Sequence, residues 1–239
     1  MTATTTGRGA ARVALRGRPA PARPPSVSAA LHARPTLEVA LLAAALVEER
    51  HPRLARVVTA DERPRRRRVQ DAAALLRAAT TDPVRALGLA ARERAVGGDP
   101  HVRPEGHDPD LLALRHALRV HCVLLTAAAA GGEPTPAAAE SYVREQRSTA
   151  VLLGAEPDDL PATLAEVAED VAAVRAEVEA DPAPVTAALG GHRDGCGDGC
   201  EDGAWHRVSR LALGVLPPWA RPGPVAVDPG GLTARLRRL

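Results

Sequence analysis

The stretch DPDLLALRHALRVHCVLL, residues 108–125, together with AAAESYVREQRSTAVLLGAEPDDLPAT, residues 137–163, decides the fold of this chain. Asp108-Pro109 stands at the start of the first part, and Thr135-Pro136 precedes the second. A capping side chain followed by proline is a strong signal for the start of a helix. Gly131-Gly132 and Gly154 follow the two apolar runs, as expected where helices end. The stretch therefore predicts two helices joined by a glycine hinge.

Similar signals outside this stretch predict further helices. Their expected ranges are 36–51, 69–81, 83–95 and 163–181, with a short helix ending at Gly214 and another after Asp228. In the range 163–181 a valine or leucine recurs every three or four residues, which is typical of a helix with one buried face. No window alternates between apolar and polar residues as a half-buried strand does. The predicted fold is all-α, a single multi-helix bundle.

The predicted organisation has three parts. Residues 1–35 are rich in Thr, Pro, Arg and Gly without periodicity, which predicts a disordered N-terminal leader. Residues 36–221 form the helical domain, interrupted by an insert rich in Gly, Asp and Cys at 190–205. Residues 222–239 form a C-terminal tail with a short helix.

The composition limits what can be concluded from missing residues. The chain has no Lys, Asn, Ile or Phe and only one Tyr and one Met. All six are encoded by codons rich in A and T, so a GC-rich genome explains their scarcity. The lack of aromatic residues therefore says little about the core or the function.

The net charge of +2 conceals an asymmetry between the two parts of the chain. Residues 1–68 hold 14 Arg and 5 acidic residues, whereas residues 69–239 hold 17 Arg and 24 acidic residues. The run RPRRRR at 63–68 is the candidate for binding phosphates. No aromatic residue is interleaved with it, and a solvated helix start or loop explains the run more simply. We expect no nucleic-acid partner.

The sequence predicts a cytoplasmic protein without an integral membrane span. Three cysteines at irregular spacing do not form a disulfide framework. The first 25 residues lack the apolar core of a signal peptide. The longest apolar run, 39–47, is shorter than the roughly 18 residues that a membrane span needs.

Two groups of residues are candidates for a catalytic or cofactor site. Arg77 and Thr81 are four residues apart on one helix face and could hold an acidic group, such as a haem propionate, or a substrate oxygen. The alternative is a surface Arg and a core-facing Thr. His116 could ligate iron from a helix that faces the bundle interior, or it could be a hydrogen-bonded structural residue. His121 lies about 140° further round the same helix, so at most one of the two faces a pocket.

Together with Tyr142, Glu145 and LPPWAR at 216–221, these residues resemble the MpaB-like oxygenases. This family includes the haem-dependent rubber oxygenases called latex clearing proteins, and the resemblance covers roughly residues 37–221. It implies a haem b cofactor, with Arg77 and Thr81 lining the active-site pocket as catalytic residues and His116 lining the same pocket as a metal ligand. It also implies a hydrophobic substrate, either a prenyl-type small molecule or a polyisoprenoid-like chain.

Residue 93 departs from the family pattern. The family carries its haem-binding His in the motif His-x-x-Val-x-Gly, and here the corresponding residues are ERAVGG, from Glu93 to Gly98. A carboxylate is a poorer axial ligand for haem iron than imidazole, although His and carboxylates together suit non-haem iron. Glu93 is thus the second predicted cofactor-binding residue. His101 and His107 in the following loop are either substitute ligands or solvated histidines.

The insert offers a separate metal candidate, His192, Cys196, Cys200 and His206. Thiolates and imidazoles can form a tetrahedral zinc site. The spacing is not one of the common paired-cysteine patterns, so a flexible acidic loop is the favoured interpretation over zinc.

Two hypotheses for the function follow. The first is a haem- or iron-dependent oxygenase in which Arg77, Thr81, Glu93 and His116 surround one cavity. The second is a divergent, non-catalytic helical binding module that retains the oxygenase scaffold, since the family's haem-ligand His is replaced by Glu93.

Overall fold

The computed structural model describes residues 26–96, 104–181, 200–221 and 228–239, and every regular element in these ranges is helical. The all-α prediction is confirmed. The α-helices are α1 (Val27–His32), α2 (Thr36–Glu48), α3 (Pro52–Ala60), α4 (Arg65–Thr81), α5 (Pro83–Val96), α6 (Pro109–Ala129), α7 (Pro136–Leu152), α8 (Leu164–Ala180), α9 (Cys200–Val215) and α10 (Pro229–Leu236). Short 3-10 helices are η1 (Pro104–His107), η2 (Pro157–Asp159) and η3 (Pro218–Ala220).

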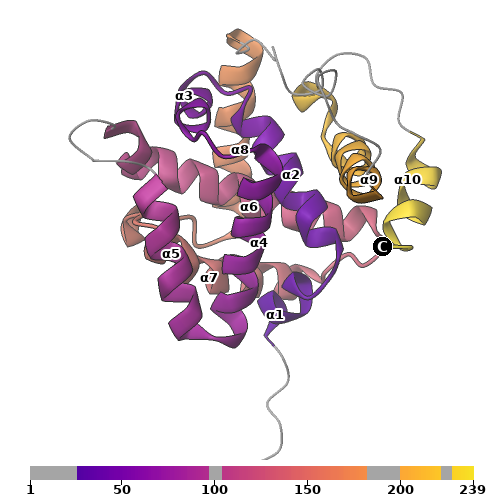
Figure 1. Ribbon diagram of the computed structural model, residues 1–239, viewed down its shortest axis with the longest axis horizontal. Helices are drawn as coiled ribbons and strands as arrows, with labels where there is room; N and C mark the ends of the chain where they lie inside the picture. Colours follow the sequence, from indigo (N-terminus) through magenta and orange to yellow (C-terminus); the bar gives the residue numbers. More distant parts are fainter. Residues whose placement is uncertain (1–25, 97–103, 182–199, 222–227) are drawn as a thin grey trace, which may run out of the picture.

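Helices α2 and α6 form the centre of the bundle. They make the most extensive contact in the fold, and α4 and α9 also pack on α2 while α7 and α8 pack on α6. Nearly all of α2 is buried because it is apolar on every side, and its side chains join one continuous core with those of α6 and α8. In Figure 1, α5 lies on the left of the molecule and α9 and α10 on the right, with α2, α4 and α6 between them.

The predicted caps of α6 and α7 are confirmed. The Asp108 carboxylate accepts a hydrogen bond from the backbone N–H of Asp110 at 3.0 Å, and the Thr135 hydroxyl accepts one from that of Ala138 at 3.3 Å. Gly131, with φ of +72°, ends α6, and Gly154, with φ of +101°, follows α7. Only glycine adopts such angles at little cost, so these two positions turn the chain.

A helix, α1, lies within the range predicted to be a disordered leader. Residues 1–25 lie outside the described part, but α1 occupies 27–32 and packs on α4 and α7. Ser26 caps α1, and Leu31 and His32 are buried. His32 contacts the Leu76 carbonyl and the Tyr142 hydroxyl at 2.9 and 3.1 Å. These long-range contacts hold a segment whose composition alone gives no sign of order.

Three other elements differ from their predicted extents. No helix is predicted after His51-Pro52, yet α3 begins there, with the His51 ring accepting a hydrogen bond from the backbone N–H of Leu54. Helix α4 begins at Arg65 rather than at 69, so most of the arginine run is helical. Helix α9 begins at Cys200, inside the predicted insert, and precedes the LPPWAR segment, where Arg221 donates to the Leu216 carbonyl at 2.8 Å.

Helix α6 is the one helix among the described residues that is long and apolar enough to cross a membrane. Its most apolar window is 56% buried within the protein, and the core helix of a soluble protein meets the same criterion. Its contacts with α2, α7 and α8 agree with a core helix.

Candidate active site

A cavity of about 230 Å³ lies inside the bundle, lined by α2, α4, α6 and α7 and also by residues of α3 and α5. Much of its wall is apolar, formed by Leu41, Ala45, Val69, Ala72, Leu75, Leu76, Leu112, Val120, Ala150 and Leu153. The charged residues in the described lining are Arg56, Arg63, Arg68, Arg94, Arg115 and Arg119 with Glu48, Asp61 and Glu93. An apolar hollow with a few polar groups is the usual form of a small-molecule site.

His116 reaches this cavity from α6. The residue is only 9% exposed, and Nε2 is buried without a hydrogen-bond partner among the described residues. Burial, together with the nearby Arg119 and Arg147 charges, lowers the pKa of His116 to about 4. The ring is therefore neutral at pH 7, the form in which imidazole can ligate a metal.

Two arginines next to His116 on α6 share one carboxylate. Arg115 Nε donates to Glu48 Oε2 at 3.1 Å, while Arg119 Nε is 3.7 Å from Glu48 Oε1, beyond hydrogen-bond distance. The Glu48 side chain is 4% exposed, and those of Arg115 and Arg119 are 25% and 22% exposed. Burial and the Arg115 charge lower the pKa of Arg119. The cluster holds one more positive charge than negative.

Glu93 lines the same cavity, but its carboxylate is already paired with the guanidinium of Arg63. Arg63 Nη1 and Nη2 donate to the two Glu93 oxygens at 2.7 and 3.1 Å. The same guanidinium binds Asp61 at 2.9 Å and Asp71 at 3.0 Å. The hydrogen bonds that Arg63 donates to Glu93 and Asp61 raise the pKa of Arg63 well above its usual range.

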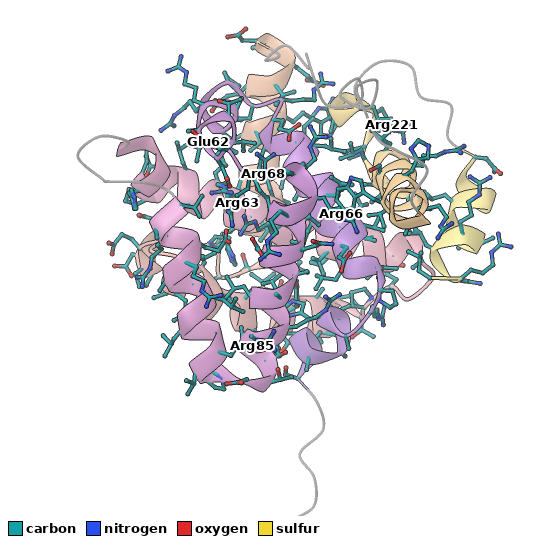
Figure 2. All side chains as sticks on the ribbon, in the orientation of Figure 1. Glu62, Arg63, Arg66, Arg68, Arg85 and Arg221 are labelled. Atoms are coloured by element: carbon teal, nitrogen blue, oxygen red, sulfur yellow. The ribbon has the colours of Figure 1, made fainter. Side chains whose placement is uncertain are left out.

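The arginine run forms the start of a helix, as one of the two simpler interpretations predicted, but its side chains are held in ion pairs rather than only by solvent. Arg65 and Arg68 both bind Glu49, and Arg67 binds Asp71. In Figure 2, Arg63 and Arg68 lie near each other by the N-terminal end of α4. Some of the acids that these arginines bind are distant in sequence, so the run alone could not reveal them.

Arg77 and Thr81 are not among the described residues that line the cavity. Arg77 Nε donates to the His32 carbonyl at 3.2 Å, its guanidinium lies 3.5 Å from Glu38, and its side chain is 42% exposed. The Thr81 hydroxyl donates to the Arg77 carbonyl at 2.9 Å, and the residue is exposed. The structure thus brings Glu93 and His116 to one cavity and places Arg77 and Thr81 elsewhere. The predicted catalytic role of these two residues rests on the resemblance alone.

Sequence reasoning missed Glu48, Arg115 and Arg119 as parts of the site. A signal was present, because Arg115 and Arg119 are four residues apart and flank His116, and Glu48 ends a helix that is otherwise almost entirely apolar. Tyr142 was singled out only as one of the residues that carry the resemblance to the oxygenase family. It lines the cavity at 1% exposure, with its hydroxyl 3.1 Å from His32 Nε2.

The remaining histidines and the insert give a mixed outcome. His107 lines the cavity, whereas His121 is not in the described lining, which agrees with its expected position further round α6. His101, His192 and Cys196 lie outside the described residues, as does the side chain of Cys200. The described residues contain no group of three or more His, Cys, Asp or Glu that could hold a metal ion.

The comparisons with known proteins give one match. Residues 29–223 match the family model described as "ER-bound oxygenase mpaB/B'/Rubber oxygenase, catalytic domain". No curated protein and no solved structure matches the chain.

Proposed function

The chain belongs to the ER-bound oxygenase mpaB/B'/rubber oxygenase family, and from that premise we propose that it is a haem- or iron-dependent oxygenase acting on a hydrophobic, prenyl-type substrate. The observation that carries this proposal is the neutral His116 ring at the wall of a largely apolar cavity, whose Nε2 is buried and has no hydrogen-bond partner in the part of the chain that the structure describes. The family's description names ER-bound members, so the cytoplasmic location stays a prediction.

His116 fits an iron ligand, and Glu93 does not. The His116 ring is neutral at pH 7 and its Nε2 has no competing partner among the described residues. Both Glu93 oxygens already accept hydrogen bonds from Arg63. We therefore propose that iron is held through His116, and when bound it supplies the activation of O2.

The size of the cavity sets a condition on haem. A cavity of about 150 Å³ holds one benzene ring, so 230 Å³ suits a ligand somewhat larger than a single ring. A porphyrin macrocycle is much larger than this. Haem therefore requires the lining to move apart. Iron without a porphyrin needs ligands in addition to His116, and the described residues group no three His, Cys, Asp or Glu side chains that could supply them.

The chain's own residues bind and shield the substrate. Leu41, Leu75, Leu76 and Val120 offer apolar contacts to a prenyl-type chain. Their burial keeps water from the reacting part of the substrate, which suppresses side reactions.

The absorption spectrum and iron content of the purified protein test this proposal. We expect iron by elemental analysis, or a Soret band after reconstitution with haemin, and we expect His116→Ala to remove it. The matched control is His121→Ala, because His121 lies on the same helix outside the described lining. A wild-type protein that holds no iron and gains no Soret band would contradict the proposal.

A non-catalytic binding module is the second candidate, and the Arg63–Glu93 pair favours it. The residue at the position of the family's haem ligand is tied into a bidentate ion pair. A chain that has lost its iron ligand would retain the apolar cavity and bind ligands without turnover. Ligand binding by a protein that holds no iron in either form would favour this candidate over the oxygenase.

A further inference from the structure

We propose that the cavity contains an anion site and that its ligand is an apolar carboxylic acid, with the carboxylate held by Arg119 and Arg115 and the apolar body against the leucine and valine wall. As a statement about the substrate, this rests on the proposed function. As a statement about binding, it rests on the charges and contacts described below.

The shared carboxylate leaves Arg119 without a full partner. Glu48 accepts a hydrogen bond from Arg115 at 3.1 Å, but its contact with Arg119 is 3.7 Å long. A guanidinium has five N–H donors, and Arg119 donates a hydrogen bond to no described residue. A partly buried cation in this state is stabilised by any anion that can approach it.

The neighbouring acids do not fill this role. Glu93 and Asp61 bind Arg63, as does Asp71, and Glu49 binds Arg65 and Arg68. Three of these acids share Arg63 and the fourth binds Arg65 and Arg68, so none of them is hydrogen-bonded to Arg115 or Arg119.

Arg147, which is not in the described lining of the cavity, adds a further positive charge near His116. Arg147 donates to the carbonyls of Leu160 and Pro157 at 3.1 and 2.7 Å, so no carboxylate neutralises it in these contacts. Arg119 and Arg147 both lower the pKa of His116, after burial. Charges that disfavour a protonated His116 favour a negative group at the same place.

The remaining lining selects an apolar body. The apolar part of the cavity wall is built from leucine, valine and alanine side chains. A small inorganic anion bound to the arginines would leave these apolar side chains without a contact. A carboxylate matches the planar fork of a guanidinium, which can donate two parallel hydrogen bonds to it. The volume of about 230 Å³ suits an acid of modest length rather than a long polymer.

Binding of three ligands of equal chain length tests the proposal. Octanoate, 1-octanol and octylamine are titrated into the full-length protein at pH 7 by calorimetry. We expect octanoate to bind at least about tenfold more tightly than octanol, the gain of a charge-assisted hydrogen bond, and octylamine to bind most weakly. Equal affinity for octanoate and octanol would overturn the proposal.

Arginine variants identify the anion partner. Arg119→Gln should weaken octanoate binding about tenfold and leave octanol binding unchanged, while Arg119→Lys should keep most of the octanoate affinity. The control is Arg175→Gln, on an exposed arginine of α8 that pairs with Glu179. Unchanged octanoate affinity in Arg119→Gln would overturn the assignment. If this variant fails to fold, the comparison of the three ligands on the wild type still decides.

These measurements separate the two proposals, because they need neither iron nor turnover. Selective octanoate binding by a protein without iron would support the anion site and contradict the oxygenase. Iron held through His116 without preference for octanoate would do the reverse.

Discussion

Replacing Glu48 with glutamine is expected to destabilise the protein strongly. The amide keeps the shape of the side chain but removes the charge that faces Arg115 and Arg119. Removing one partner of a buried ion pair costs about 3–5 kcal/mol, because the remaining charge is left uncompensated. Since the side chains of both arginines are roughly a quarter exposed, solvent screens their charges in part. We therefore expect a loss near the lower end of this range, about 3 kcal/mol.

Urea unfolding at pH 7, followed by the helical circular dichroism signal, measures this loss. With a slope of about 2 kcal/mol per molar urea, the midpoint should fall by about 1.5 M. The control is Glu179→Gln, whose carboxylate is half exposed and pairs with Arg175, and it should cost less than about 0.5 kcal/mol. Adding Arg119→Gln to Glu48→Gln should restore part of the stability, since one unbalanced charge is removed. A midpoint for Glu48→Gln within about 0.3 M of the wild type would refute the compensating role of Glu48.

Three further predictions concern pH, backbone and core. Because the folded-state pKa of His116, about 4, lies below its unfolded value of 6.5, the unfolded chain binds the proton more readily. The stability from this group is complete above pH 6.5 and is lost as the pH falls, by about 2 kcal/mol at pH 5, so His116→Gln should show a smaller drop in urea midpoint between pH 7 and pH 5. Gly154→Ala should cost about 1–2 kcal/mol because its φ is +101°, whereas Gly88→Ala, in open space within α5, should raise the thermal midpoint through a gain of about 0.5–1 kcal/mol. Leu118→Ala, 1% exposed in the core shared by α2 and α6, should cost about 2–5 kcal/mol in the same urea assay, and a loss below 1 kcal/mol would mean that this core is poorly packed.

Local signals in the sequence were enough to predict the central helices. Asp108-Pro109, Thr135-Pro136 and Gly154 act through bonds to residues two to four positions away, so their effect is readable from the sequence alone. The same holds for the valines of α8, whose spacing places them on one buried face.

Elements held by distant partners could not be predicted in this way. Helix α1 has six residues, too few to be stable on its own, and it is fixed by bonds from His32 and Ser28 to α4 and α7. The start of α4 is likewise set by Glu49 and Glu93, which the chain brings to the arginine run only on folding.

The candidate site was predicted only in part, because it too depends on contacts between helices that are distant in sequence. Helical spacing correctly separated His116 from His121, since that depends on the geometry of one helix. Whether a residue on another helix reaches the cavity depends on how that helix is rotated. Leu75 and Leu76 of α4 face the cavity, which turns Arg77 toward His32 and Glu38 instead.

The charges around the cavity explain how a carboxylate can stand at position 93. A half-buried Glu93 without a cation would lose hydration and gain little in return. Arg63 removes this cost with two hydrogen bonds to Glu93, while Asp61 and Asp71 hold the guanidinium in place. Because both Glu93 oxygens are used there, Glu93 does not pair with Arg119, which is left with only the 3.7 Å contact to Glu48. The glutamate at 93 and the incompletely paired guanidinium at 119 are therefore parts of one charge arrangement, in which the polar end of the cavity favours an anion.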